Sequence, residues 1–304
     1  MREGSLYTLT GRTGEGKTAL LVLLALAIVT GRGDLIGRKV KKGRVAFATA
    51  ENPDDLRMRF MVACFVLKLD PSIIGRDLLV SDNRVAPEDI HDWLRSTGGE
   101  FTLVVIDTWQ AFFDGREPNN NSEAVSFTRR FRPLKSLRGS PVVIIAAHPV
   151  KNASDDNLLP YGGGGTLNEV DGNFTLNLDE TGLYRFHWLG KIRGQPFDPT
   201  YFRIDRDLDS PDVMTVEGAR VKIPVMFPVD EEAVEARGKA IANKDEDLLQ
   251  ALNANPGASI SELAGAANTP RGSVQRVLAR LHRQKLVYMN NLENGSSPTP
   301  EKRL

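Results

Sequence analysis

The segment GRTGEGKT (11–18) constrains the fold of this chain more than any other part of its sequence. It follows SLYTL (5–9), whose pattern predicts a strand, and it precedes an apolar segment (17–30) that predicts a helix. A Gly-x-x-x-x-Gly-Lys-Thr loop between a strand and a helix encloses a phosphate chain with its backbone N–H groups and the positive end of the helix dipole. The expected phosphate-binding residues are Gly11, Arg12, Thr13, Gly14, Glu15, Gly16, Lys17 and Thr18.

Two side chains of this loop and one later carboxylate are candidates for nucleotide chemistry. Lys17 should reach the β- and γ-phosphates, and the Thr18 hydroxyl should bind Mg²⁺. Asp107 ends the apolar run FTLVVID (101–107), where a second Mg²⁺-binding acid is expected. The alternative is an aspartate that only caps the following turn. The expected cofactors are therefore ATP and Mg²⁺.

Composition narrows the class of protein. The 304 residues are 41% hydrophobic and 26% charged, which is typical of a globular chain with one large domain, or a medium and a small one. The net charge is zero, so contact with nucleic acid must come from local patches. A single cysteine, Cys64, excludes an internal disulfide and fits a reducing cytosol. The apolar run 20–29 is shorter than the roughly 20 residues that span a bilayer, so we expect a cytoplasmic protein with no membrane partner.

Apolar runs alternate with helix-like segments as far as His148. Three runs are continuously apolar, as in a parallel sheet that is buried on both faces: 43–51, 101–107 and 141–148. The expected helices after the first cover 54–69, 86–98 and 122–137. Residues 151–165 are polar and Gly-rich and predict a loop, and 173–191 predict an antiparallel hairpin around a DETG turn. The expected fold is α/β, with a mainly parallel sheet in a domain that covers residues 1–225.

The remaining chain predicts a separate module. Residues 226–243 are charged and weakly patterned, which predicts a linker or linker helix. Residues 244–304 predict three short helices followed by a small hairpin, the outline of a winged helix-turn-helix domain.

Polar residues stand at the ends of two further predicted strands. Glu51 follows the second strand and His148 follows the strand VVIIAA. Because carboxyl ends of parallel strands share one edge of a sheet, Glu51, Asp107 and His148 should face the nucleotide. Glu51 is the candidate that orients or deprotonates water, and His148 is a candidate γ-phosphate sensor. Structural roles stay open for both: an acid at a helix start for Glu51, and a satisfied strand-end histidine for His148.

Taken in order, the segments GRTGEGKT, ATAENP, LVVIDT, AAHPVK, YGGGGTLNEVDG and GKIRG resemble the RecA-like P-loop ATPases. They are most similar to the RepA-like hexameric replicative helicases of plasmids, phages and other mobile elements. The resemblance covers roughly residues 4–207. It implies that Glu51 polarises the catalytic water and that His148 couples the γ-phosphate to a DNA-binding loop.

The resemblance also implies an active site shared between subunits. Lys191 and Arg193 would form a finger that reaches the γ-phosphate of the neighbouring subunit, in a homo-oligomer expected to be a hexameric ring. On the residues alone, this pair predicts a solvated strand face. Lys151 and the glycines 162–165 would lie on or beside a pore loop that contacts single-stranded DNA, and 115–123 would form the other inward loop. Few residues precede the first strand, so we expect no N-terminal segment that links subunits.

The segment RGSVQRVLARLHRQK (271–285) predicts the recognition helix of the C-terminal module, because it has an apolar face and a basic remainder. The apolar face consists of Val274, Val277, Leu278 and Leu281. Ser273 and Gln275 could reach base edges. The residues expected to contact phosphates are Arg271, Arg276 and Arg280. The alternative is a helix that packs against a replication protein.

These features predict an ATP-dependent DNA motor, a replicative helicase that hydrolyses ATP at subunit interfaces and translocates on single-stranded DNA. Two alternatives stay open. One is a DNA-binding regulator of replication or transcription that ATP controls. The other is a RecA-like recombination ATPase without unwinding activity.

Overall fold

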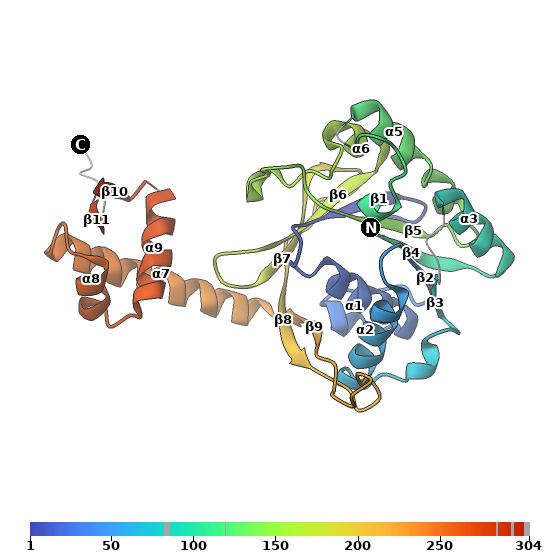
Figure 1. The fold of residues 1–304 in the computed structure, drawn as a ribbon, viewed down its shortest axis with the longest axis horizontal. Coiled ribbons are helices and arrows are strands. Elements are labelled where there is room, and N and C mark those ends of the chain that lie inside the picture. Colours follow the sequence, from blue (N-terminus) through green and yellow to red (C-terminus); the bar gives the residue numbers. More distant parts are fainter. Residues whose placement is uncertain (82–85, 119, 284, 293–294, 301–304) are drawn as a thin grey trace. The chain divides into compact units, whose positions relative to one another are not determined.

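The computed structural model describes the chain except residues 82–85, 119, 284, 293–294 and 301–304. It divides into two compact units, Met1–Asp230 and Glu231–Leu304 (Figure 1). No helix in the described ranges is long and apolar enough to cross a membrane.

The first unit is built on a nine-stranded sheet with the order β3-β2-β4-β5-β1-β6-β7-β8-β9. The strands from β3 to β6 in this order pair in parallel, and β7, β8 and β9 continue the sheet antiparallel. The strands are β1 (Leu6–Thr10), β2 (Arg44–Thr49), β3 (Leu78–Val80), β4 (Phe101–Asp107), β5 (Val142–Ala147), β6 (Gly172–Leu178), β7 (Tyr184–Ile192), β8 (Thr200–Leu208) and β9 (Ile223–Val229). The predicted mainly parallel α/β sheet and its hairpin are confirmed.

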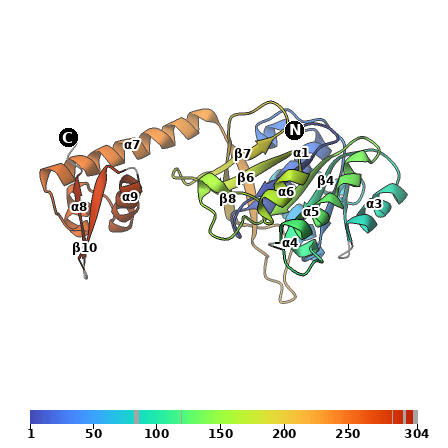
Figure 2. The same ribbon diagram turned by 90° about the horizontal axis from the view of Figure 1, so that it is seen from above.

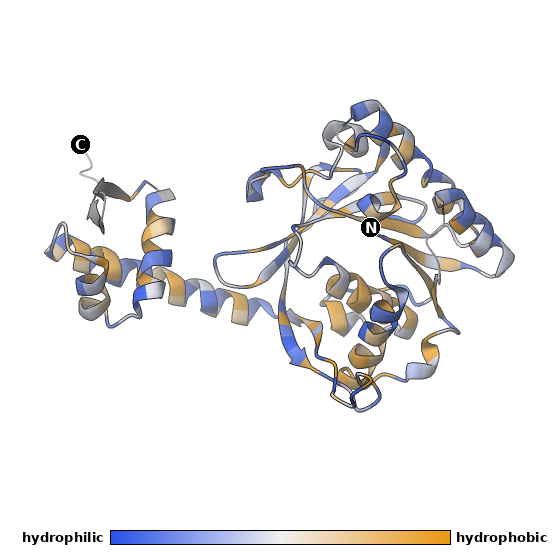
Figure 3. Ribbon diagram, viewed as in Figure 1, coloured by the Kyte–Doolittle hydropathy of each residue, from blue (hydrophilic) through white to orange (hydrophobic). Residues whose placement is uncertain are grey.

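Helices cover both faces of this sheet, so successive strand residues enter two separate cores. On β4, Leu103 and Val105 pack with the helices α1 (Lys17–Thr30) and α2 (Pro53–Val66), whereas Val104 and Ile106 face the other side. That other face is covered by α3 (Pro87–Ser96), α4 (Trp109–Phe112), α5 (Asn121–Arg129) and α6 (Gly163–Glu169) (Figure 2). Helix α1 is buried almost all round, and Figure 3 shows it in mainly apolar colours.

One helix of this unit was predicted with the wrong boundary, and one strand was not predicted. The predicted helix 122–137 ends at Arg129 and continues as a 3₁₀ turn, Arg132–Ser136, because Pro133 lacks the N–H that an α-helix needs. Strand β9 was not predicted, and the unit extends past residue 225. The two prolines of β9 are tolerated because it is an edge strand.

The glycine run 162–165, predicted as part of a loop, starts helix α6 instead. Gly162 precedes the helix with φ 78°, a backbone conformation that favours glycine. A Cβ on Gly165 would lie 2.7 Å from the backbone oxygen of Asn121 in α5. Gly162 and Gly165 are therefore the glycines that the close approach of α5 and α6 requires, which the composition of the segment did not reveal.

The second unit contains α7 (Glu231–Ala254), α8 (Ile260–Ala266), α9 (Arg271–Arg283) and the antiparallel pair β10 (Val287–Leu292) and β11 (Gly295–Pro300). Its core includes Leu248, Leu252, Leu263 and the apolar face of α9. Of the residues 226–243 that predict a linker or linker helix, the first belong to β9, and those from Glu231 onward are helical because α7 runs from Glu231 into the module. Residues 231–247 are rich in strong helix formers, which explains their helical state without burial.

Candidate nucleotide-binding site

The phosphate-binding loop (residues 11–18) connects β1 to α1 and is shaped by strands of the same sheet. Gly14 and Gly16 have φ values of 79° and 86°, which an L side chain rarely adopts. A Cβ on Gly16 would lie 2.4 Å from Ile204 of β8, and one on Gly11 would lie 2.6 Å from the backbone oxygen of Leu176 in β6. The glycines thus allow both the turn of the loop and its close contact with the sheet.

Lys17 lies at the centre of this loop and is 6% exposed. Its Nζ donates to the carbonyl oxygens of Gly11, at 2.7 Å, and Arg12, at 3.0 Å. Burial lowers the pKa of Lys17, and the nearby carboxylates of Asp107, Glu15 and Glu51 oppose this shift. The ammonium group is therefore held at the loop, where phosphate oxygens would be bound.

Thr18 and Asp107 meet at the carboxyl end of β4. The Thr18 hydroxyl donates to Asp107 Oδ2 at 2.8 Å. Burial raises the pKa of Asp107 to about 6, against the lowering effects of the Thr18 hydrogen bond and of Lys17. Asp107 Oδ1 is also buried, and it has no hydrogen-bond partner within the part of the chain that the structure describes. A buried, unpaired carboxylate oxygen beside a hydroxyl is suited to a hard cation.

The Thr18 hydroxyl and the Asp107 carboxylate fit the Mg²⁺ that such a loop implies. Among the described residues there is no group of three or more His, Cys, Asp or Glu side chains that could hold a metal ion by themselves. Mg²⁺ in phosphate sites is bound by one or two protein oxygens together with phosphates and waters. The donor set of Thr18 and Asp107 corresponds to that arrangement.

Glu51 follows β2, and Thr49 of that strand pairs with Asp107 across the sheet. Its side chain is exposed, and its charge acts on both Lys17 and Asp107. Asn52 caps α2, since its side chain accepts from the N–H groups of Asp54 and Asp55. Glu51 thus lies next to the site and directly before the cap of α2, so its alternative role as an acid at the helix start stays open.

His148 follows β5 and faces the loop. Its Nδ1 lies 3.3 Å from Lys17 Nζ and 3.4 Å from Thr13 Oγ1. Burial and the charge of Lys17 lower the pKa of His148, so the ring is neutral near pH 7 and Nδ1 can accept from Lys17. Gln110, which the sequence analysis missed, accepts from the His148 N–H at 3.2 Å. Its only sequence signal is its position three residues after Asp107.

The loop also contacts the segment that follows His148. The Arg12 guanidinium pairs with Asp155 and donates to the carbonyl oxygen of Ala153 at 2.9 Å. Lys151 is exposed in the turn before Ala153. His148 and Arg12 therefore form two direct connections between the phosphate-binding loop and residues 148–155.

A further arginine, Arg206 of β8, reaches the loop and was not singled out from the sequence. Its Nη2 donates to the Gly14 carbonyl at 3.2 Å and to the Tyr184 hydroxyl at 2.9 Å. Arg206 comes close only because the antiparallel strands return beside β6, so its sequence context carried no signal.

Lys191 and Arg193 lie at the opposite edge of the sheet. Ile192, at the end of β7, pairs with Gly172, which in turn pairs with Tyr7 near the start of β1. The phosphate-binding loop follows the other end of β1, about 15 Å away at the rise of a strand. Lys191 Nζ donates to the carbonyl of Leu167 at 2.9 Å, and Arg193 donates to Asp171 at 3.1 Å. These two residues are not brought to the loop of their own chain.

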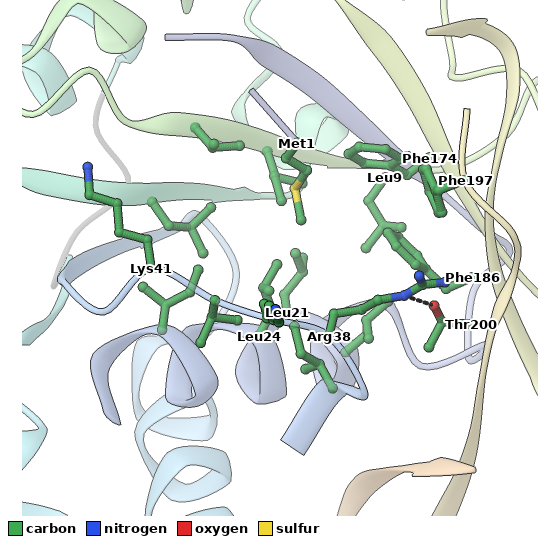
Figure 4. A pocket seen from close by; sticks show the side chains of 18 of the residues that line it. Met1, Leu9, Leu21, Leu24, Arg38, Lys41, Phe174, Phe186, Phe197 and Thr200 are labelled. Atoms are coloured by element: carbon green, nitrogen blue, oxygen red, sulfur yellow. Dashed lines mark hydrogen bonds between the residues drawn. The ribbon is translucent and has the colours of Figure 1, made fainter. Parts of the chain in front are cut away.

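A cavity of about 700 Å³ also lies toward this edge, between α1 and the sheet. Figure 4 shows Leu21 and Leu24 of α1 on one side and Phe174, Phe186 and Phe197 on another, with Arg38 donating to Thr200. The described residues that line it include none of residues 11–18. The cavity is therefore not the nucleotide site.

In the second unit, α9 buries Val274, Val277, Leu278 and Leu281 as predicted. Arg271, Gln275 and Arg276 are exposed, and Ser273 is half-buried. The Arg276 guanidinium donates to Ser273 Oγ at 3.2 Å.

Arg280 corrects the predicted set of phosphate contacts. Its side chain is 9% exposed and is paired with Asp245 of α7. The guanidinium therefore joins two helices of the unit and is not presented to DNA.

Comparison with known families agrees with this division of the chain. The model described as an AAA domain matches residues 1–154, and the model described as an IclR helix-turn-helix domain matches residues 247–290. No curated protein resembles the chain closely enough to count as a match. The first match covers half of the chain and includes the loop, Glu51, Asp107 and His148, and the second covers α8, α9 and the adjoining parts of α7 and β10. This chain therefore belongs to the AAA domain family, as a nucleotide-hydrolysing ATPase with a C-terminal helix-turn-helix domain.

Proposed function

We propose that this protein is an ATP-dependent DNA motor, a replicative helicase that hydrolyses ATP between subunits and translocates on single-stranded DNA. The observation that carries the proposal is the placement of the candidate groups on two opposite edges of one sheet. The phosphate-binding loop, Asp107 and His148 are at one edge, and Lys191 and Arg193 are at the other. Each chain thus carries the nucleotide-binding half of a site at one edge and the Lys191 and Arg193 half at the other, and two chains would complete one site.

At the first edge, Lys17 and the backbone of the loop bind the phosphates, and Thr18 and Asp107 hold Mg²⁺. When bound, Mg²⁺ neutralises charge on the β- and γ-phosphates. Glu51 orients a water molecule and accepts its proton as the oxygen of that water bonds to the γ-phosphorus and the bond to the ADP oxygen breaks. The products are ADP and phosphate.

Coupling to DNA is proposed to run through His148 and Arg12, because both join the loop to the segment that carries Lys151. The neutral His148 ring accepts from Lys17 and can therefore respond when Lys17 moves to a γ-phosphate. Lys151 would contact the backbone of single-stranded DNA in a pore.

The second edge is proposed to complete the site of a neighbouring copy. Arg193 follows β7 at the edge opposite its own loop and its side chain is 66% exposed, so its guanidinium is accessible to another subunit. Lys191 and Arg193 would stabilise the charge that develops on the transferred phosphoryl group. A heterologous contact of this kind forms a ring when the rotation between subunits closes, and we propose a ring of six copies.

For the second unit we propose duplex DNA binding through the exposed Arg271, Gln275 and Arg276, with docking onto a replication protein as its alternative. Arg271 and Arg276 would contact phosphates, and Ser273 and Gln275 would reach base edges.

The test is ATP hydrolysis with and without single-stranded DNA, followed by unwinding of a forked duplex. Wild type should be stimulated by the single strand and should unwind the fork, whereas Lys17→Ala should lose turnover. Lys39→Ala, an exposed lysine away from the loop, is the matched control and should behave as wild type. If single strands neither bind nor stimulate turnover, the motor proposal is wrong.

A second candidate is a DNA-binding regulator that ATP only assembles, and the helix-turn-helix match favours it. Sequence-specific duplex binding by the full chain, with little turnover on any DNA, would select this candidate. Strand exchange without directional unwinding would instead select a recombination ATPase.

A further inference from the structure

Asp171, between α6 and β6, connects the start of β1 to the segment that carries Arg193. Its N–H donates to the Leu6 carbonyl at 2.6 Å, and its Oδ2 accepts from the Leu6 N–H at 2.9 Å. On the other side, its carbonyl accepts from the Arg193 N–H at 2.7 Å, and its Oδ1 accepts from the Arg193 guanidinium at 3.1 Å. Backbone and side chain of one residue therefore fix both neighbours.

The surroundings keep this carboxylate charged. Burial acts to raise the pKa of Asp171, but the Leu6 N–H and the positive charges of Lys135 and Arg193 outweigh it and lower the pKa below its usual value. Lys135 Nζ lies 3.7 Å from Oδ2, and the Asp171 side chain is 14% exposed. Asp171 thus offers a fixed negative charge to an arginine that is itself largely exposed.

Apart from Lys135, three cations near Asp171 have other partners. Arg129 and Arg132 pair with Glu169 at 3.1 and 2.9 Å. Lys191 Nζ binds the carbonyls of Leu167 and Asn168, at the C-terminal end of α6, where a cation is favoured. Asp171 is left as the acid that orients Arg193.

We infer that Asp171 is a positioning residue that holds Arg193 in the geometry needed at the neighbouring subunit's nucleotide. The inference rests on the proposed function, in which Arg193 acts on the adjacent subunit. Asp171 binds the start of β1, the strand whose other end carries the phosphate-binding loop. Asp171 therefore connects Arg193, which acts on the nucleotide of the neighbouring subunit, to β1, which carries the phosphate-binding loop of its own subunit.

The variant that tests this is Asp171→Asn. The asparagine oxygen can still accept from the Leu6 N–H, but the amide carries no charge and no longer pairs with Arg193. Turnover of ATP should fall about ten- to a hundredfold, because a misplaced group near the reacting centre costs rates of this order. The dissociation constant for a fluorescent ADP analogue should change less than about twofold, since the loop is untouched.

Glu169→Gln is the matched control, because it breaks the adjacent ion pairs with Arg129 and Arg132 and leaves Arg193 in place. It should retain most of the turnover. Unchanged turnover in Asp171→Asn, or an equal loss in Glu169→Gln, would overturn the positioning role.

Mixed oligomers separate a role on the neighbour from a role within the same chain. Lys17→Ala has a defective loop but an intact Arg193, and Asp171→Asn has the reverse. When the two chains are co-expressed with different tags and purified together, activity should return at about a quarter of the junctions in a random one-to-one mixture. An inactive mixture would mean that Asp171 acts on its own loop, which contradicts the inference.

A parallel mixture of Lys17→Ala with Arg193→Ala separates a failure of the role of Asp171 from a failure of the proposed shared site. If this reference mixture regains turnover and the Asp171→Asn mixture does not, only the role of Asp171 is wrong. If neither regains turnover, the proposed shared site is wrong and the inference falls with it. Because the readout is ATP turnover, the absence of unwinding would bear on the helicase proposal alone.

Discussion

Asp107 should make the stability of the first unit depend on pH in an unusual direction. Burial raises the pKa of Asp107 to about 6, from an ordinary value of 3.8. In this interval the folded chain binds more protons at Asp107 than the unfolded chain does. The free energy of unfolding contributed by this group therefore falls as the pH rises through the interval, opposite to the usual effect of a salt-bridged carboxylate.

The size of this effect follows from the two pKa values. Between about pH 5 and about pH 7, Asp107 should remove about 1.3 kcal/mol from the free energy of unfolding. The asparagine of Asp107→Asn cannot titrate. As the pH rises from about 5 to about 7, the free energy of unfolding of the variant should therefore increase by about 1.3 kcal/mol relative to that of wild type. Asp212→Asn, at an exposed position of the same unit, is the control and should show no comparable shift.

Urea unfolding followed by tryptophan fluorescence measures this shift. Trp93, Trp109 and Trp188 are the three tryptophans of the chain, and all lie in the first unit, so the signal does not report on the second. A difference between Asp107→Asn and wild type that is the same at both pH values would refute the reasoning.

Stabilisation by nucleotide with Mg²⁺ should depend on pH in the opposite direction to the contribution of Asp107 itself. Because a cation binds the carboxylate form of Asp107, the stabilisation of wild type by a non-hydrolysable ATP analogue with Mg²⁺ should weaken below about pH 6. The analogue should add much less stability to Asp107→Asn at either pH. Equal stabilisation of both proteins would show that Asp107 does not take part in binding the metal.

Four other substitutions test the nucleotide site and the C-terminal unit separately. Glu51→Gln should bind nucleotide normally but lose about a hundredfold or more in single-turnover hydrolysis, and normal hydrolysis would exclude it as the base. Arg206→Ala should weaken nucleotide binding about fivefold in a fluorescence titration, because the Gly14 carbonyl loses a donor worth about 1 kcal/mol. Arg276→Ala should reduce duplex affinity and lower the slope of its salt dependence by about one, whereas Arg280→Ala should leave that slope unchanged. Instead, Arg280→Ala should lower the stability of the second unit by about 2 kcal/mol in a circular dichroism melt, because it leaves the partly buried carboxylate of Asp245 without its arginine.

The glycine spacing and the apolar runs were enough to predict the elements of the first unit that define it as an α/β nucleotide-binding domain. The glycine spacing of residues 11–18 follows from steric limits within a few residues, so it is visible in sequence. The continuous apolar runs that form β2, β4 and β5 lack the polar residues that a surface strand alternates with, so they predict strands that are buried on both faces. The strand ends at Glu51, Asp107 and His148 follow directly from those runs.

Other features depended on partners far away in the chain. Arg280 was predicted to contact phosphates because it is basic, but it is buried because it pairs with Asp245 on another helix. The glycines 162–165 were predicted as part of a loop, whereas they start helix α6, and Asn121 of α5 leaves no room for a Cβ at Gly165. Arg206 was overlooked because only the return of β8 beside the loop gives it a contact.

The sequence by itself determined that this chain folds as an α/β ATPase around a phosphate-binding loop, with a helix-turn-helix module after it. These properties are encoded by residues that are neighbours along the chain. The tertiary structure alone decided that Arg193 lies at the edge opposite that loop and is held by Asp171. That arrangement depends on the pairing of β1 with β6 and of β6 with β7, in which Leu6 contacts a residue 165 positions later. Contacts over such separations leave no periodic trace in the sequence, because they are fixed by strand order.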